Sequence, residues 1–336
     1  MTAAEGDSYL IMIPALELTQ LGKSFDSPQG SSVIVKDFNL KVSPGEFVCI
    51  IGHSGCGKST VLSIVMGLNN PTEGGVILAG KKTSGPGLDR GIVFQSSALL
   101  PWLTARDNVL LSLDQVSKNR SWKERRELAE HNLALVGLGV VADSYPGELS
   151  AGMRQRVGIA RAFAQQPKVL LLDEPFSLLD VVTRMELQDE IMRLCEEQKR
   201  TVLMVTHDVD EALLLADRVV MMSNGPGATV GEIVAVPFAR PRNRFEILAD
   251  PIYDRTRGHL ITFLEERANP RQIGEAPAVK KRPVTEPNTP QTVRGVTAEE
   301  LFVVEKYTGL NRFRGRYRRK LLVEEFVDRP TQAQAL

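Results

Sequence analysis

Three features are scarce in this sequence of 336 residues: cysteine, long apolar runs and an excess of either charge. The three cysteines, Cys49, Cys56 and Cys195, are odd in number and widely spaced. They exclude a disulfide framework and a cysteine-based metal site, and they favour a reducing compartment. Lysines and arginines number 41, as do aspartates and glutamates, so no overall field draws the chain to nucleic acid or to lipid.

Long apolar segments are also absent, since no stretch approaches 18 uninterrupted apolar residues. We therefore expect no transmembrane helix. The run from Tyr9 to Ala15 is short, contains Pro14 and follows no positively charged region, so we expect no signal peptide. With 43% hydrophobic and 24% charged residues, the composition is that of a soluble protein with a full core. A role at a membrane would need a partner.

The strongest motif is a glycine-rich segment that reads GHSGCGKST, between a strand-like apolar run at 47–51 and a helix-like run that begins at 61. This arrangement is a P-loop, in which backbone N–H groups and a helix N-terminus converge on phosphate oxygens. Lys58 is expected to reach the β- and γ-phosphates, and the Ser59 hydroxyl to bind Mg²⁺. The predicted nucleotide ligands in this loop are Gly52, His53, Ser54, Gly55, Cys56, Gly57, Lys58, Ser59 and Thr60.

A second motif is the pair Asp173 and Glu174, which ends the apolar run at 169–172. Carboxylates at the end of a buried strand are costly unless something uses them. We expect Asp173 to hold Mg²⁺ through its water shell. Glu174, one residue further along the pleat, is expected to point away from the metal and to act as a general base toward water.

Two further segments each allow two interpretations. Phe25 either stacks on an adenine ring or packs at a sheet edge. Ser150 and Gly152 open a predicted helix, and they form either a simple N-cap or a second anion site. The position of Ser150, 23 residues before Asp173, favours the anion site.

Alternation of strand-like and helix-like segments predicts an α/β fold with a parallel sheet. Ligands bind such sheets at the carboxyl ends of the strands, where Gly52, Gln95, Asp173 and His207 fall. The other expected strands are 16–18, 33–42, 74–80, 91–94, 201–206, 218–223 and 229–236, with Phe25 between the first two; the expected helices are 122–138, 151–165, 183–198, 208–217 and 241–267.

In their order along the chain, these motifs resemble those of ABC-type ATPases. The P-loop, Gln95, the Leu-Ser-x-Gly motif, Asp-Glu-Pro, the segment 177–180 and His207 carry the resemblance, which covers residues 16–267. It implies a P-loop NTPase (RecA-like) core, an antiparallel β subdomain and a helical signature subdomain at about 100–165. The ATPase domain would then span residues 1–268.

The resemblance also implies how the motifs cooperate. In that family two subunits enclose two ATP molecules head to tail. The P-loop of one subunit would then face the signature of the other, made of Ser150, Ala151, Gly152 and Met153. Gln95 would sense Mg²⁺ and the attacking water, Asp180 would cross the dimer interface, and His207 would contact the γ-phosphate. The second subunit would be a copy of this chain or a paralogue.

Other segments are similar to one branch of importers. Residues 84–90 look like those of nitrate, sulfonate and taurine importers, and 52–58, 204–215 and 224–242 like those of nitrate, bicarbonate and cyanate ATPases. This implies an ATP-hydrolysing subunit, peripheral on the cytoplasmic face of the inner membrane, that energises anion import through permease subunits and, indirectly, a solute-binding protein. Nitrate or nitrite is the preferred substrate; sulfonate or taurine, bicarbonate and cyanate are alternatives.

Two other function classes compete with this reading. ABC ATPases that act on DNA or ribosomes carry coiled-coil insertions or tandem halves, whereas Lys58 and Asp173 here lie 115 residues apart in a chain with one P-loop. A nucleotide-binding module without turnover would leave Glu174 and His207 idle. We expect neither class, and no direct contact with nucleic acid.

Three expectations concern segments outside these motifs. The apolar segment from Leu99 to Trp102 either lines a groove for a permease helix or packs internally. Cys56 in the P-loop should react with thiol-alkylating reagents, with loss of activity. Residues 269–336 hold 13 lysines and arginines against 8 acidic residues, and their first part, 269–291, reads as a linker with five prolines. They are expected to form a basic, partly disordered extension, either solvated or in contact with anionic lipid or a regulatory partner.

Overall fold

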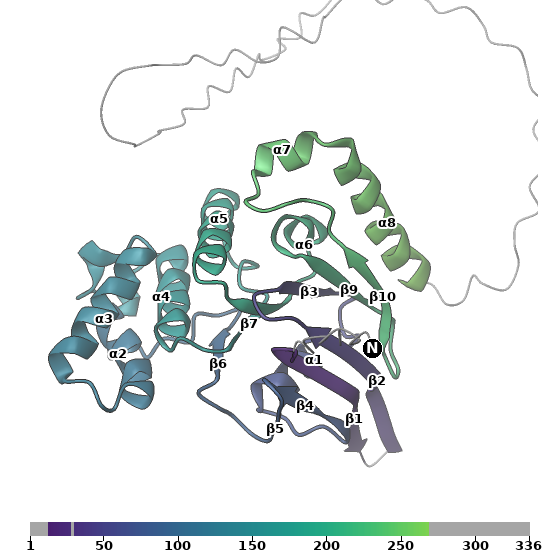
Figure 1. Ribbon diagram of the computed structural model, residues 1–336, viewed down its shortest axis with the longest axis horizontal. Helices are drawn as coiled ribbons and strands as arrows, with labels where there is room; N and C mark the ends of the chain where they lie inside the picture. The colour runs from purple at the N-terminus through teal and green to yellow at the C-terminus, as the bar shows by residue number, and fades with distance from the viewer. Residues whose placement is uncertain (1–12, 28–29, 269–336) are drawn as a thin grey trace, which may run out of the picture. The chain divides into compact units, whose positions relative to one another are not determined.

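The centre of the fold is a six-stranded sheet with the order β10-β9-β3-β8-β7-β6 (Figure 1). The computed structural model describes residues 13–27 and 30–268. The strands are β3 (Phe47–Ile51), β6 (Arg90–Val93), β7 (Val169–Asp173), β8 (Thr201–Val205), β9 (Arg218–Met222) and β10 (Val230–Ala235). The pairs β3–β8, β3–β9, β7–β8 and β6–β7 are parallel, and β10 joins β9 antiparallel at the edge. The predicted parallel sheet is confirmed.

Both faces of this sheet are buried. In β3, Phe47 and Cys49 belong to one hydrophobic core, whereas Val48 and Ile50 belong to another. Successive side chains of a strand point to opposite faces, so each strand supplies both cores. Helices α4 (Ala151–Ala164), α5 (Val181–Glu197) and α6 (Val209–Leu215) line the first core, and α1 (Lys58–Met66) lines the second. Burial on both sides explains why these strands read as continuous apolar runs.

A second, antiparallel sheet has the order β2-β1-β4-β5. Its strands are β1 (Leu16–Ser27), β2 (Gly30–Val42), β4 (Glu73–Leu78) and β5 (Lys81–Thr83). Inward side chains such as Leu18, Phe38 and Val76 join the core beneath α1. The expected antiparallel strands are therefore present.

The expected end of β1 was wrong. The alternation predicted a strand at 16–18 and placed Phe25 between strands, but β1 continues to Ser27. Its pairing with β2 shifts register between Leu18 and Leu21, where Gln20 has a φ of 47°. A bulge of this kind resets the in–out alternation while the pairing continues. The sequence pattern therefore breaks where the strand does not.

Between β6 and β7 the chain is mainly helical. The elements are α2 (Ala105–Val116), α3 (Trp122–Leu135), the 3₁₀ turns η1 (Gly139–Val141) and η2 (Pro146–Glu148), and α4. Thr104, Ser121 and Ser150 cap the three α-helices, each accepting a hydrogen bond from a backbone N–H three residues on. The helices stand to one side of the sheet in Figure 1. This matches the helical character expected for about 100–165, with α3 ending at Leu135 rather than at 138.

The last described segment forms two helices instead of the one expected over 241–267. Helix α7 (Arg244–Ala249) ends before Asp250, and α8 (Pro251–Ala268) begins with a proline. A residue before proline is disfavoured in the helical conformation, and proline suits the first helical position, so the break falls there. The expectations for 269–336 lie outside the described residues. Among the helices that are described, none is long and apolar enough to cross a bilayer.

Candidate functional site

The carboxyl ends of four adjacent parallel strands bring the predicted site residues together. The loop from Gly52 follows β3, Gln95 lies two residues after β6, Asp173 ends β7 and His207 lies two residues after β8. Because β3, β8, β7 and β6 are neighbours in the sheet, these side chains meet along one edge.

The P-loop has the backbone geometry that an anion site needs. Gly55 and Gly57 have φ values of 79° and 107°, which only glycine adopts without strain. A Cβ on Gly57 would also lie 2.9 Å from a methyl group of Val35. Helix α1 follows directly, with no side-chain cap and no acidic residue in its first turn. Its first N–H groups are therefore free to face phosphate.

Lys58 is held at the centre of this loop. Its side chain is buried, and Nζ donates to the carbonyl oxygens of Gly52 at 2.7 Å and His53 at 2.9 Å. An ammonium group has three N–H donors, so within the described residues one remains for a phosphate oxygen. The loop thus positions its own cation before any nucleotide arrives.

A pocket of about 460 Å³ lies over the loop and reaches both a carboxylate and an aromatic ring. Phe25, Lys58, Ser59 and Glu174 are among its lining residues. The Phe25 side chain is 46% exposed, and Lys23 Nζ lies 4.8 Å from its ring centroid. Phe25 therefore projects beside the P-loop instead of packing into the core, which leaves its ring face available to a base.

The donor set near Ser59 suits Mg²⁺. Ser59 Oγ lies 3.5 Å from Asp173 Oδ1. Burial raises the pKa of Asp173, and the charge of Glu174 raises it further. A cation here would reverse this effect by favouring the carboxylate. No cluster of three or more His, Cys, Asp or Glu residues that could hold a metal ion occurs in the described part of the chain.

Glu174 is the best-oriented candidate base. Its Oε2 lies 3.4 Å from His207 Nδ1 and 3.5 Å from Gln95 Nε2. Its backbone has a φ of 43°, and its N–H donates to the Val205 carbonyl at 2.9 Å. The pleat of the strand was expected to direct this side chain. The left-handed turn at Glu174 does so instead, because β7 already ends at Asp173.

The signature residues lie apart from the pocket over the P-loop. Ser150 caps α4 by accepting the Met153 N–H at 3.2 Å, and Ala151 begins the helix. Gly152 is buried against α5, where a Cβ would lie 2.4 Å from Thr183 Cγ2. None of these four residues lines the P-loop pocket. One chain therefore does not bring the two predicted anion sites together.

Asp180 sits at the start of α5 on an exposed apolar surface. Its Oδ1 accepts the N–H groups of Val182 and Thr183. Hydrogen bonds from the Thr183 side chain and backbone lower the pKa of Asp180. Leu178, Val181 and Val182 around it are all more than 60% exposed. Apolar residues gathered in this way mark an interaction surface.

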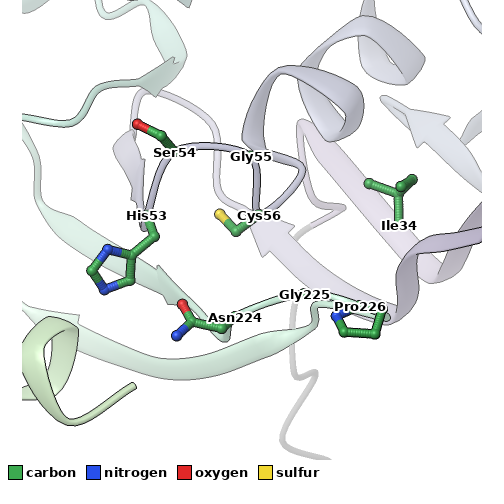
Figure 2. Close-up of a pocket in the computed structure, with 8 residues that line it drawn as sticks. All are labelled: Ile34, His53, Ser54, Gly55, Cys56, Asn224, Gly225 and Pro226. Atoms are coloured by element: carbon green, nitrogen blue, oxygen red, sulfur yellow. The ribbon is translucent and has the colours of Figure 1, made fainter. Parts of the chain in front are cut away.

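A second pocket, of about 480 Å³, lies on another side of the P-loop (Figure 2). His53 and Cys56 lie across it from the turn Asn224–Pro226, and Ser54, whose hydroxyl points away from that turn, also lines it. His53 Nε2 also donates to the Leu264 carbonyl at 2.6 Å, which ties the loop to α8. In the sequence, residues 224–226 stood out only within a segment similar to nitrate, bicarbonate and cyanate ATPases. No local pattern predicted the contact between His53 and Leu264, which are 211 residues apart.

The expected alkylation of Cys56 needs correction. The side chain is only 3% exposed, and burial raises the pKa of its thiol above the usual value. The thiolate is the reactive form, so a buried thiol with a raised pKa reacts slowly. Position in a surface loop suggested access, but the loop folds the sulfur inward against Gly52, whose added Cβ would lie 2.9 Å from Sγ.

Two contributors to the site were missed by the sequence reasoning. Ser177 Oγ lies 3.0 Å from Gln95 Nε2 and donates to the Glu174 carbonyl at 3.0 Å. Gln155 contacts the backbone beside both Gln95 and Glu174. A glutamine on a helix suggests a structural role only when it is buried, and the sequence alone does not show which face of this helix is buried.

Known proteins resemble this chain over the part described above. Residues 35–177 match the ABC transporter family. The chain is 51% identical over 247 residues to the nitrate import ATP-binding protein NrtD of Synechococcus elongatus, covering 74% of this chain and 90% of that protein. It is 49% identical over 252 residues to the bicarbonate transport ATP-binding protein CmpD of Synechocystis sp., covering 75% and 89%.

Among solved structures, the chain is similar to the dimeric ATP-binding cassette MJ0796 in a post-hydrolysis state bound to ADP and Pi. The TM-score is 0.60 at 34% identity, and the match covers 67% of this chain and all of that one.

Proposed function

This chain belongs to the ABC transporter family, and from that premise we propose that it hydrolyses ATP to energise import of a small anion, nitrate or nitrite, through a partner permease. The observation that carries the proposal is the convergence of Lys58, Asp173, Glu174 and His207 at the ends of adjacent parallel strands. Each of these groups has a task in phosphoryl transfer, and one sheet edge holds them all.

The P-loop side of the site binds the nucleotide. The N–H groups of the loop and of the α1 N-terminus hold the phosphates, and Lys58 places its charge against the β- and γ-phosphate oxygens. Phe25 offers a ring face for the adenine. Ser59 and Asp173, with Gln95 beside them, would hold Mg²⁺, which supplies charge neutralisation for the triphosphate.

The other side of the site activates water. Glu174 accepts a proton from a water molecule that attacks the γ-phosphorus, so ATP and water give ADP and phosphate. His207 and Gln95, both within 3.5 Å of the Glu174 carboxylate, orient the carboxylate and the water. His207 then meets the γ-phosphate oxygens. Removal of the carboxylate should therefore affect turnover much more than binding.

A second ATPase subunit completes the site. Ser150, Ala151, Gly152 and Met153 lie outside the P-loop pocket of their own chain, and the proposal assigns them to the pocket of the second subunit. The exposed apolar residues around Asp180 support contact between subunits. The cassette MJ0796, to which this chain is similar, is dimeric, which agrees with this arrangement.

The permease contact is assigned to the loop after Gln95. Trp102 is 69% exposed and follows the half-buried Leu99 and Leu100 and the exposed Pro101, so it projects toward solvent instead of packing internally. A large exposed aromatic suits a groove for a helix of a membrane subunit. Such a contact would hold the chain at the cytoplasmic face of the inner membrane. In membranes that carry the whole transporter, Trp102→Ala should uncouple ATP hydrolysis from transport without lowering the thermal stability of the ATPase subunit.

Nitrate is preferred as substrate, and bicarbonate is the second candidate. The identity to the nitrate protein is 51% and to the bicarbonate protein 49%, so both remain in the proposal. The permease and solute-binding protein recognise the anion, and the present chain touches neither anion directly.

Uptake in a strain that lacks this chain tests the proposal. Labelled nitrate uptake should be lost, restored by the wild-type chain and not restored by Lys58→Ala. Labelled bicarbonate uptake, measured in the same cells, should stay unchanged. Loss of bicarbonate uptake alone would replace the first substrate with the second. Normal uptake of both anions would contradict the transport proposal.

A further inference from the structure

Gln155 is a buried polar side chain that none of the roles above uses. It lies on α4, five residues after the signature serine, and is 3% exposed. A buried amide is costly unless its hydrogen-bonding groups find partners. Its partners therefore indicate what the residue holds in place.

Both N–H groups of the Gln155 amide are engaged by backbone oxygens. Nε2 donates to the Phe94 carbonyl at 2.9 Å and to the Pro175 carbonyl at 2.9 Å. Phe94 directly precedes Gln95, and Pro175 directly follows Glu174. One side chain thus joins the two strand ends that carry the water-sensing amide and the candidate base.

The two residues next to these carbonyls need such a clamp. Gln95 is exposed and lies two residues beyond the end of β6, so the strand ladder does not fix it. Glu174 has a left-handed backbone conformation, which surrounding contacts must maintain. The 3.5 Å separation between Gln95 Nε2 and Glu174 Oε2 depends on both segments.

Helix α4 is also anchored at its first turn. Gly152 packs directly on Thr183 in α5, and Arg156 forms ion pairs with Glu186 and Glu190 of that helix. The helix that begins with the signature residues therefore contacts the catalytic strand ends through Gln155. Two hydrogen bonds thus connect this helix directly to the residues next to Gln95 and Glu174.

We propose that Gln155 is a positioning residue that sets the Gln95–Glu174 geometry and couples it to the signature helix. This rests on the proposed ATPase function and goes beyond it, because it assigns communication between the two half-sites to one amide. Gln155 is not among the residues that line the pocket over the P-loop.

Gln155→Leu tests the proposal, since it removes both N–H donors and keeps a side chain of similar size. ATP turnover by the purified full chain should fall about 10- to 100-fold, the loss typical of a small misplacement of reacting groups. The KM for ATP should change by less than about twofold, because the P-loop contacts are untouched. Phosphate release at varied ATP concentration measures both constants.

Ser112→Ala is the matched control. Ser112 of α2 is also buried, and its hydroxyl lies 2.8 Å from the Val109 carbonyl of α2 and 3.1 Å from the Arg161 carbonyl of α4, away from the strand ends. Ser112→Ala should lower the melting temperature about as much as Gln155→Leu does, but its kcat should stay close to the wild-type value. Equal losses of kcat in Ser112→Ala and Gln155→Leu would reduce Gln155 to a packing role and overturn the proposal, as would wild-type kcat in Gln155→Leu.

A double variant separates positioning from general damage. If Gln155 acts through Glu174, then Glu174→Gln and Glu174→Gln/Gln155→Leu should have the same residual kcat. A further drop in the double variant would contradict the proposal. If Gln155→Leu does not fold, Gln155→Asn replaces it as the test, because it keeps the amide but shortens the side chain by one methylene. Gln155→Asn should also lower kcat, and an unchanged kcat in this variant would contradict the proposal. Wild-type chain without any ATP turnover would instead contradict the proposed function.

Discussion

Helices α1 and α4 both begin at the predicted phosphate sites, but their N-termini are built differently. Gly57 precedes α1 and offers no side chain, so the first N–H groups of α1 have no side-chain cap. Ser150 precedes α4, and its hydroxyl already accepts the Met153 N–H. Uncapped N–H groups are what an anion binds at a helix N-terminus.

This difference indicates how the two half-sites share the nucleotide. The α1 terminus is open within one chain and sits beside the buried Lys58. At the α4 terminus the Ser150 cap already engages the Met153 N–H, which leaves the N–H groups of Ala151 and Gly152 and the Ser150 hydroxyl proton to offer. We therefore expect the P-loop to supply most of the binding free energy, and the signature to contribute chiefly during turnover in a closed dimer.

The largest expected effect is on the α1 side. Lys58→Ala removes the cation that faces the transferred phosphate, so turnover should fall about 1000-fold, as for other cations at such centres. Binding of a fluorescent ATP analogue should weaken as well. Lys118→Ala, at an exposed lysine, serves as control. Turnover above half of wild type in Lys58→Ala would mean that the loop backbone alone carries the site.

The next effect separates binding from chemistry. Glu174→Gln keeps the shape of the side chain but removes the base, so turnover should fall by at least about 100-fold. ATP binding at α1 should persist, and gel filtration with ATP should show an accumulated dimer. Exposed Glu127→Gln is the control. Simultaneous loss of nucleotide binding would contradict the assignment of Glu174 to the water side.

A pair of variants at the α4 terminus distinguishes capping from phosphate contact. Ser150→Ala should cost about 1 kcal/mol in the free energy of unfolding, because the cap is lost. Ser150→Asp keeps an N-cap acceptor but opposes the γ-phosphate with a negative charge, so turnover should fall more than about tenfold at nearly unchanged stability. Urea unfolding and phosphate release measure the two effects. If Ser150→Asp turns over ATP normally, Ser150 is only a cap.

The smallest effect concerns the N-terminus of a further helix, α5, which Asp180 caps. Hydrogen bonds from the first turn of α5 lower the pKa of Asp180 in the folded chain below its unfolded value, near 3.8. The ionised carboxylate therefore stabilises the fold at pH values above 3.8, and this stabilisation is lost as the pH falls through the folded-state pKa. Asn also caps helices, so Asp180→Asn removes the charge alone. Urea unfolding should show a small deficit at neutral pH that shrinks with acidification. A deficit independent of pH would contradict this.

The sequence predicted much of the site because local chemistry carried it. The glycines before Lys58 predict a local phosphate-binding turn, and the carboxylates after an apolar run predict a strand end. Both signals lie within a few residues, and the structure brings the two segments to one sheet edge. The break at Asp250 had a local signal in Pro251 that the expectation of one helix passed over. The bulge in β1 had none, because a reset of alternation looks like the end of a strand.

Other features depended on contacts between distant segments. Burial of Cys56 against Gly52 and the contact from His53 to Leu264 arise only when the loop closes on its neighbours. The same holds for Gln155, whose carbonyl partners lie 61 and 20 residues away. Sequence distance hides such pairs, since no periodic pattern links them.

The sequence by itself determined which residue types stand together: the glycines and Lys58 of the loop after β3, and the carboxylates of Asp173 and Glu174 after the apolar run of β7. Glycine, lysine and paired carboxylates act through local backbone geometry and charge, which sequence fixes within a few residues. The tertiary structure alone decided which groups are reachable and which are coupled, from the buried thiol of Cys56 to the amide of Gln155. Burial and hydrogen-bond partners belong to the packed chain, because they depend on segments that meet only after folding.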